Sequence, residues 1–158
     1  MNDMTHTELL ELAFRVAADE SAWRHLVRHD PSRRTYEQVF RDDRVGVWLI
    51  CWMDDHDTGF HDHDVSSGAV AVVRGRLREE RLALGGNRSR IYCAGESFDF
   101  AADDIHRMSH PGGEPAVTIH AYSPPLWRMG AYEVLDTGEL RRWSLSYAEE
   151  LRPIGAET

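Results

Sequence analysis

From residue 45 onward the chain is a series of short strand-like runs separated by turn residues, and this pattern limits the possible fold more than any other feature. Residues 45–53 are apolar on both faces, which favours a buried central strand. Glycine or proline separates the shorter runs that follow, which cover residues 69–73, 77–84, 89–94, 116–122, 131–135 and 140–145. Many short strands at nearly regular spacing predict an all-β barrel or jelly roll.

The residues before this region have a helical period instead. Apolar side chains recur at helical spacing, at Leu9, Leu10, Leu12, Ala13 and Val16. Thr5 or Thr7 suits the N-cap, and a second short helix is expected to begin near Asp19 and to end before Pro31. The predicted fold class is therefore all-β with short N-terminal helices.

The length of 158 residues predicts one domain over residues 1–158. It would comprise a helical prelude at 1–34, a β-barrel at 35–146 and a C-terminal tail at 147–158. The chain carries 18 basic and 27 acidic residues, a net charge of −9, which argues against nucleic acid or an anionic membrane as a partner.

Three further features suggest a cytoplasmic protein. There is no apolar run of about 20 residues, so no membrane-spanning helix is expected. The N-terminus lacks a basic stretch followed by an apolar core, so no secretory signal is expected. Cys51 and Cys93 both lie in apolar runs and are expected to be reduced core residues.

His61-Asp62-His63 is the sharpest local motif. In a strand the side chains at positions i and i+2 share a face, so His61 and His63 could bind one metal ion while Asp62 points away. The polar loop at residues 54–59 places this pair at a strand start near a barrel mouth. A pair of surface histidines has the same motif, so the motif alone does not establish a metal site.

A second polar pattern lies at Thr118, His120 and Tyr122, which alternate onto one face of a predicted strand. Ile119 and Ala121 lie on the other face. Such a strand is either a solvent-facing edge or the lining of a polar cavity, and the apolar surroundings favour the cavity.

Taken in order, these segments resemble the cysteine dioxygenase family of thiol dioxygenases within the cupins. The segments that carry the resemblance are Leu49-Ile50-Cys51-Trp52, His61-Asp62-His63, Val73-Arg74-Gly75, Ile105-His106-Arg107 and Thr118-Ile119-His120-Ala121-Tyr122-Ser123-Pro124-Pro125. The resemblance implies a cupin jelly roll and an Fe(II) site formed by His61, His63 and His106. It also implies that Thr118, His120 and Tyr122 replace a Ser-His-Tyr relay and that the Ser123–Pro124 peptide is cis.

The chain departs from the family patterns at several positions. Many cupins have a glutamate ligand where this chain has Ser67 and Gly68. Animal cysteine dioxygenases have a cysteine at the position of Gly68, cross-linked to the tyrosine that matches Tyr122, so this cross-link is not expected here. Cysteine-specific members have Tyr-x-Arg, whereas this chain has Tyr36-Glu37-Gln38, which resembles the 3-mercaptopropionate branch.

In that branch an arginine beyond the relay tyrosine holds the substrate carboxylate. The predicted substrate-binding residues are therefore Gln38, Tyr36 and Arg128, with Arg41 and Arg44 as weaker candidates.

The predicted function is an Fe(II)- and O2-dependent thiol dioxygenase that converts a small thiol carboxylate to its sulfinate. Cysteine, 3-mercaptopropionate and related thiols all remain open as substrates. Three neutral imidazoles leave the full charge of a divalent ion and an open coordination face for a thiolate. Two alternatives remain: a cupin metalloenzyme of another reaction type, and a non-catalytic cupin that binds a small molecule. A monomer or weak homo-oligomer is expected.

Other conspicuous side chains are expected to be structural. His56 is predicted to be a solvated loop residue and His110 a turn residue, and Met108 is expected to pack near the site. Surface positions are predicted for His6, His25 and His29, and core positions for Trp48, Trp52, Trp127 and Trp143.

Overall fold

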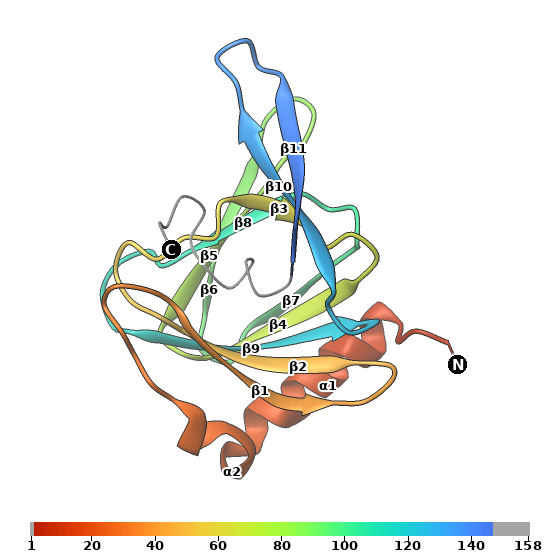
Figure 1. Ribbon diagram of the computed structural model, residues 1–158. Helices are drawn as coiled ribbons and strands as arrows, with labels where there is room; N and C mark the ends of the chain where they lie inside the picture. Colours follow the sequence, from red (N-terminus) through yellow and green to blue (C-terminus); the bar gives the residue numbers. More distant parts are fainter. Residues whose placement is uncertain (1, 147–158) are drawn as a thin grey trace.

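Two antiparallel sheets face each other in the computed structural model, which describes residues 2–146 (Figure 1). Sheet A has the strand order β1 (Thr35–Arg41), β2 (Gly46–Trp52), β9 (Ala116–Ser123), β4 (Ser67–Arg74) and β7 (Ser97–Phe100). Sheet B has the order β11 (Leu140–Ser146), β10 (Arg128–Val134), β3 (Phe60–Asp62), β8 (His106–Ser109), β5 (Arg76–Arg81) and β6 (Arg88–Cys93). This is the predicted all-β jelly roll.

The N-terminal helices cover the outer face of sheet A (Figure 1). Helix α1 (His6–Ala18) begins with a capping box in which Thr5 and Glu8 each accept a hydrogen bond from the other's backbone N–H. Asp19 then caps α2 (Glu20–Trp23), and a 3₁₀ turn (Arg24–Leu26) ends the helical segment before Pro31, as predicted. Leu9 and Ala13 of α1 are fully buried against the sheet.

Strand β9 lies in the middle of sheet A, between β2 and β4, and each of its residues is buried. Val117, Ile119 and Ala121 join the core beneath the helix, whereas Tyr122 belongs to the core between the sheets. The two faces of the strand therefore serve different cores. This excludes the edge-strand alternative and confirms that Thr118, His120 and Tyr122 line the barrel interior.

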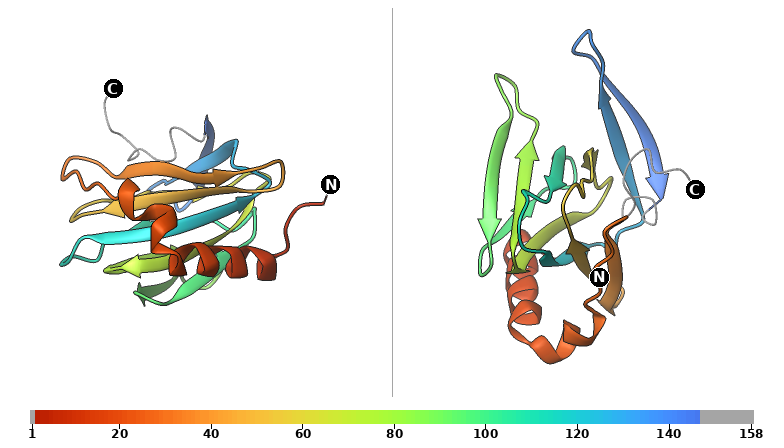
Figure 2. Two further views of the ribbon diagram at one scale, coloured as in Figure 1. Left: turned by 90° about the horizontal axis from the view of Figure 1, so that it is seen from below. Right: turned by 90° about the vertical axis from the view of Figure 1, so that its left-hand side faces the viewer.

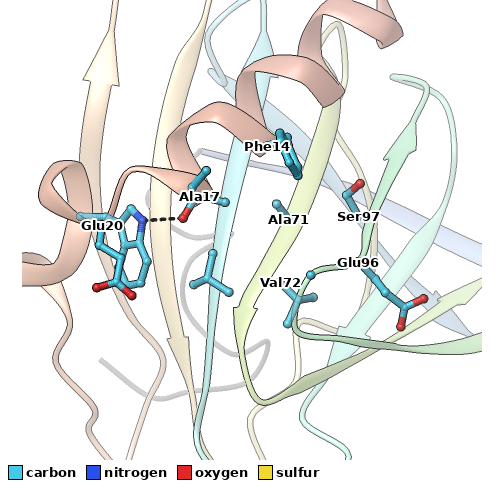
Figure 3. A pocket seen from close by; sticks show the side chains of 11 residues that line it. Phe14, Ala17, Glu20, Ala71, Val72, Glu96 and Ser97 are labelled. Carbon is cyan, nitrogen blue, oxygen red and sulfur yellow. Dashed lines mark hydrogen bonds between the residues drawn. The ribbon is translucent and has the colours of Figure 1, made fainter.

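Two hairpins, β5–β6 and β10–β11, extend beyond the body of the barrel in the same direction (Figure 2). On the opposite side, a shallow pocket lies between α1 and the outer face of sheet A; Phe14, Ala17 and Ala71 contribute to its lining (Figure 3). None of the described helices is long and apolar enough to cross a membrane.

The predicted strands are all present, with shifts of a few residues at their ends. Strands β1, β3, β7 and β8 were not delimited from the sequence. Strands β3, β7 and β8 have only three or four residues each, too few to establish an alternating pattern. The predicted tail at 147–158 lies outside the described residues.

Several predictions about single residues were wrong. Cys93 is exposed, because it lies on the edge strand β6 on the face opposite buried Tyr92. Trp127 and Trp143 are 69% and 36% exposed rather than core residues, the first after β9 and the second on the edge strand β11.

His56 is not solvated but buried. Its Nδ1 accepts a hydrogen bond from the backbone N–H of Met53, and its Nε2 lies 3.2 Å from the Pro31 carbonyl oxygen, so the ring ties this loop to the segment after the helices. His110 does close a turn, with Nδ1 accepting from the backbone N–H of Gly112. His25 is exposed, and His6 and His29 are half-buried.

Candidate metal centre

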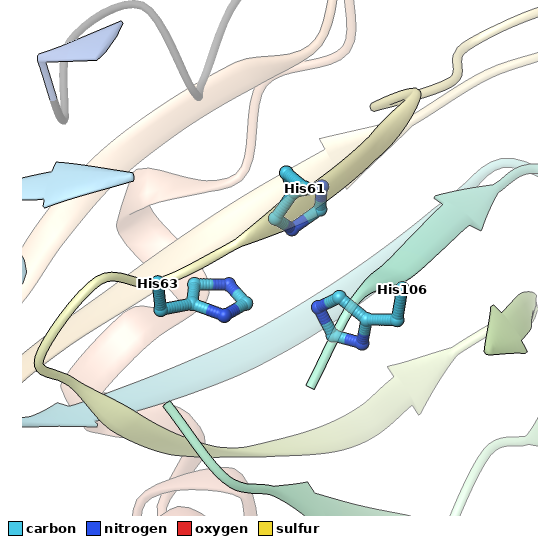
Figure 4. Close-up of side chains that lie close together, drawn as sticks. All are labelled: His61, His63 and His106. Carbon is cyan, nitrogen blue, oxygen red and sulfur yellow. The ribbon is translucent and has the colours of Figure 1, made fainter. Parts of the chain in front are cut away.

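Three histidine rings from sheet B and the loop after β3 converge in the barrel interior (Figure 4). His61 lies on β3, His63 follows that strand directly, and His106 begins β8. One nitrogen from each ring can be chosen such that all three lie within 4.8 Å of one another. The three side chains are at most 1% exposed. The predicted metal ligands are therefore brought together.

Strand pairing explains why these histidines meet although His106 is distant in sequence. His61 and His106 are direct partners in the β3–β8 ladder, with ring centroids 4.7 Å apart. His63 returns to the same side two residues after His61, and its backbone N–H donates to the Ala102 carbonyl, just before β8. Its ring centroid is 4.8 Å from that of His61.

Asp62, between the two histidines, points away from the site as predicted. Its carboxylate accepts hydrogen bonds from the backbone N–H of Gly130, the Tyr132 hydroxyl and the Arg142 guanidinium. Burial alone would raise the pKa of Asp62, but the bonds from Arg142, Tyr132 and the backbone outweigh it and lower the pKa to about 2. The motif is thereby fixed to β10 and β11.

Backbone and carboxylate acceptors hold two of the rings in a defined orientation. His61 Nδ1 lies 3.0 Å from the Gly59 carbonyl oxygen, and His106 Nδ1 lies 2.7 Å from Oε2 of buried Glu79. Both Nδ1 atoms therefore donate, which leaves the Nε2 lone pairs for a ligand. Among the described residues, the buried Nε2 of His106 has no hydrogen-bond partner.

Burial sets the protonation state of His106. Removal from water, with His61 and His63 close by, holds the pKa of His106 well below its usual range, so the ring is neutral near pH 7. Burial also raises the pKa of Glu79, while the adjacent Arg81 guanidinium, 3.0 Å away, opposes this rise. Arg81 itself is held by Asp104 and by the Asp99 carbonyl.

The donor set fits a divalent transition metal. Three neutral imidazoles bind such an ion without cancelling its charge. Among the described residues, no cysteine, aspartate or glutamate joins this group of three. Ser67 and Gly68, at the position of the cupin glutamate, provide no carboxylate.

The second predicted constellation lies on β9, opposite the histidines. Thr118 Oγ1 is 2.7 Å from His120 Nε2, and His120 Nδ1 is 3.2 Å from the Tyr122 hydroxyl oxygen. All three side chains are fully buried. The Tyr122 and His63 ring centroids are 5.4 Å apart, so this relay reaches the histidine cluster.

The Phe100 ring occupies the space beside Gly68, with its centroid 6.2 Å from that of Tyr122. Gly68 pairs directly with Tyr122 across β4 and β9. A Cβ atom at position 68 would lie 2.3 Å from the Phe100 ring. The same ring stacks against His63, with centroids 4.4 Å apart. Gly68 is therefore required for the position of Phe100.

The predicted substrate residues separate into two groups. Tyr36 and Gln38 lie on the same face of β1, and the Tyr36 ring contacts the Trp48 ring in the barrel core. Gln38 pairs with Trp48, which in turn pairs with His120, so Gln38 lies level with the relay. The structure thus places these two residues on the relay side of the barrel, where Tyr36 is half-buried and Gln38 is exposed.

Arg128 is not brought to the histidines. Its neighbours Met129 and Ala131 are buried, and Ala131 pairs with His61, so Arg128 lies on the outer face of β10. Its side chain is 58% exposed and lies 3.8 Å from Asp64. Arg41 is exposed, and Arg44 contacts Glu8 on α1.

Glu79 and Phe100 were not identified from the sequence. Glu79 could have been found, because it alternates with buried Leu77 on β5 and is thus an acidic residue on an apolar face. Phe100 gave no signal beyond its hydrophobicity. The cis Ser123–Pro124 peptide and the position of Met108 in the barrel core are as predicted.

Comparison with known proteins gives a consistent result. The profile of a family described as "Cysteine dioxygenase type I" matches residues 3–134. Human cysteine dioxygenase type 1 is 26% identical over 129 residues, which cover 73% of this chain and 64% of the human protein. The chain thus spans less than two thirds of the length of that relative.

Solved structures support the fold. A protein from Thermus thermophilus matches with a TM-score of 0.58 and 18% identity, covering 65% of this chain and 93% of its own. A cupin superfamily protein from Desulfitobacterium hafniense matches with a TM-score of 0.55 and 11% identity, covering 65% of this chain and 87% of its own. The fold is that of the cupins.

Proposed function

The chain belongs to the cysteine dioxygenase type I family, and on this basis we propose that it is an Fe(II)-dependent thiol dioxygenase acting on a small thiol carboxylate. The proposed reaction adds both atoms of dioxygen to sulfur, RS⁻ + O2 → RSO2⁻. The observation that carries the proposal is the buried three-histidine cluster without a carboxylate, with the Tyr122 ring against His63. A fourth, anionic ligand would reduce the charge available to a thiolate.

His61, His63 and His106 would hold the iron through their Nε2 atoms. When bound, Fe(II) supplies a cation that lowers the pKa of the substrate thiol and the redox chemistry of dioxygen transfer. The protein orients two of the rings, through the Gly59 carbonyl for His61 and through Glu79 for His106, and burial keeps His106 neutral. Burial of the cluster also excludes water.

We propose that Thr118, His120 and Tyr122 position one proton donor beside the reacting sulfur and oxygen atoms. Tyr122 is closest to the metal ligands, and His120 and Thr118 continue away from them along β9. Since the three side chains are fully buried, the chain of hydrogen bonds does not compete with bulk water.

For the substrate we propose a short thiol carboxylate that contacts Gln38 and Tyr36. Both lie on the face of β1 that pairs toward the relay, with Tyr36 half-buried and Gln38 exposed, and glutamine offers an amide N–H₂ to a carboxylate. The binding of the substrate carboxylate by Arg128 stays a prediction, since the Arg128 guanidinium lies beside Asp64 on the outer face of β10. Cys51 and Cys93 form no disulfide, which supports the proposal of a cytoplasmic protein.

Oxygen uptake by the anaerobically Fe(II)-loaded protein tests the proposal. The panel comprises cysteine, 3-mercaptopropionate, cysteamine and, as controls, serine and 3-hydroxypropionate. We expect uptake with at least one thiol carboxylate and none with the hydroxyl analogues. Uptake with the hydroxyl acids alone would indicate a cupin metalloenzyme of another reaction type. Absence of bound iron and of any uptake would indicate a non-catalytic cupin.

A further inference from the structure

A fourth side chain, Trp52, continues the relay of Thr118, His120 and Tyr122 on the side remote from the histidine cluster. Trp52 is fully buried on β2, and its indole N–H donates to Thr118 Oγ1 over 2.9 Å. We propose that this bond sets the direction of the whole relay, so that His120 is protonated at Nδ1 and Tyr122 retains its own hydroxyl proton for donation. Trp52 would thus be a positioning residue.

For the two hydrogen bonds that join Thr118, His120 and Tyr122, two arrangements of protons are compatible with the positions of the heavy atoms. In the first, Thr118 donates to His120 Nε2, and His120 Nδ1–H donates to the Tyr122 oxygen. In the second, His120 Nε2–H donates to Thr118, and the Tyr122 hydroxyl donates to His120 Nδ1. Only the first leaves the Tyr122 proton for another acceptor, because each imidazole nitrogen of a neutral ring either donates or accepts.

The distances around Thr118 favour the first arrangement. An indole nitrogen can only donate, so Trp52 occupies one of the two acceptor positions of the Thr118 oxygen. The hydroxyl proton of Thr118 then has two possible acceptors, His120 Nε2 at 2.7 Å and the Ile50 carbonyl oxygen at 3.4 Å. A hydroxyl hydrogen bond of 2.7 Å is of ordinary strength, whereas one of 3.4 Å is weak. The second arrangement would require the weak bond.

Trp52 strengthens this preference. A hydroxyl that accepts a hydrogen bond becomes a better donor, because neighbouring hydrogen bonds polarise one another. The guanidinium carbon of buried Arg34 lies 5.2 Å from the centre of the Trp52 ring. This cation withdraws electron density from the indole and makes its N–H a stronger donor. Arg34 therefore acts on the relay through Trp52.

The consequence for the site rests on the proposed function, whereas the proton arrangement does not. If Tyr122 donated to His120, it would present a lone pair to the substrate region. In the arrangement that Trp52 favours, Tyr122 presents an O–H, which suits an anionic thiolate or a developing negative charge on oxygen. A measurement of the His120 tautomer therefore tests this inference separately from any activity.

The experiment is long-range ¹H–¹⁵N NMR of the Zn(II)-loaded chain, in which the two nitrogens of a neutral imidazole have distinct shifts. The His120 signal is identified by its loss in the His120→Gln variant. In the wild-type chain we expect protonation at Nδ1. In Trp52→Phe, which removes the indole N–H, we expect the ratio of the two tautomers to shift severalfold toward Nε2–H. The shift is smaller than the effect of a whole hydrogen bond, because the indole donates to Thr118 in both arrangements and only its polarisation of the Thr118 hydroxyl favours one of them.

Trp23→Phe is the matched control. Trp23 is also buried against sheet A, and its indole N–H also donates one hydrogen bond, 3.2 Å to the Ala17 carbonyl, but on the helix side. We expect this variant to leave the His120 tautomer unchanged. A wild-type His120 protonated at Nε2 would overturn the inference, and so would identical tautomer ratios in Trp52→Phe and Trp23→Phe. Should Trp52→Phe not fold, the wild-type spectrum decides alone.

Discussion

The two sheets contribute to the site in different ways. Sheet B and the loop after β3 provide the three histidines, which are supported by charged groups: Glu79 and Arg81 behind His106, and Asp62 with Arg142 between His61 and His63. Sheet A provides Thr118, His120 and Tyr122 from a strand that is buried at every residue. Their support comes from a neutral indole donor and from the packing of Phe100.

This difference follows from what covers each sheet. Helix α1 covers the outer face of sheet A, so charges there would be buried without water. The outer side of sheet B has no such cover among the described residues, and Arg142 reaches Asp62 from it with a side chain that is 38% exposed. Arg81 lies on the inner face, as the direct partner of His106, but its side chain is still 31% exposed. We therefore expect the histidine cluster to be more sensitive to charge and pH, and the relay to be more sensitive to the shape of its packing.

Loss of a ligand on sheet B should have the largest effect. His106→Ala removes one of the three proposed ligands, and we expect bound iron to fall from one per chain to a trace, with thiol-dependent oxygen uptake lost as well. Metal analysis of anaerobically prepared protein measures this. His25→Ala, at an exposed histidine, is the control and should retain its iron. Stoichiometric iron in His106→Ala would mean that His106 is not a ligand.

Loss of the charge behind a ligand should have a smaller effect. Glu79→Gln removes the carboxylate that accepts from His106 Nδ1, and substitutions of such supporting groups typically weaken metal binding by about 10- to 100-fold. Competition titration with a chelator measures the Kd for Zn(II). Glu80→Gln, on the neighbouring position of β5, is the matched control. Equal Kd values for the two variants would remove Glu79 from the site.

On sheet A the corresponding test is steric. Gly68→Cys places a Cβ atom against the Phe100 ring, so we expect a loss of about 1–3 kcal/mol in the free energy of unfolding. The double variant Gly68→Cys with Phe100→Leu should recover part of that loss, because the smaller side chain makes room. Denaturant unfolding measures both. A single variant as stable as the wild type would show that Phe100 moves aside without cost.

The pH dependence of stability should show the charged support of sheet B. The pKa of Asp62 is about 2 in the folded chain and near 3.8 when unperturbed, so the unfolded chain binds the proton more readily. The ionised Asp62 carboxylate contributes about 2 kcal/mol to the free energy of unfolding. This contribution is complete above about pH 4 and is lost as the pH falls toward 2. The free energy of unfolding of Asp62→Asn should therefore fall less than that of the wild type between pH 4 and pH 2, as denaturant unfolding at each pH would measure. If the free energy of unfolding fell equally with pH in both chains, the lowered pKa of Asp62 would be contradicted.

The smallest expected effect concerns substrate choice. Gln38→Arg places a guanidinium on the face of β1 that carries Tyr36, and we expect the ratio of kcat/KM for cysteine to that for 3-mercaptopropionate to rise. Arg128→Gln, on the outer face of β10, should leave this ratio unchanged. A change in Arg128→Gln and none in Gln38→Arg would place the carboxylate site on the other side of the barrel.

The sequence predicted those parts of the site that depend on local spacing. His61, His63 and the Thr118–Tyr122 alternation follow from the two-residue period of strands, and the ordered resemblance added His106. The contacts that arise from long-range pairing were not predictable. Glu79 reaches His106 only because β5 pairs with β8, and Phe100 fills the space at Gly68 only because β7 pairs with β4. The same holds for Arg128, whose orientation depends on the pairing of β10 with β3.

The most direct test of the central claim is the fate of labelled dioxygen. The Fe(II)-loaded protein is mixed with a thiol carboxylate under ¹⁸O2, and the product is analysed by mass spectrometry. We expect a sulfinate that carries two ¹⁸O atoms in wild-type protein and no such product in His106→Ala. A protein with one iron per chain that yields only disulfide, or a product without label, would contradict a thiol dioxygenase built on these three histidines.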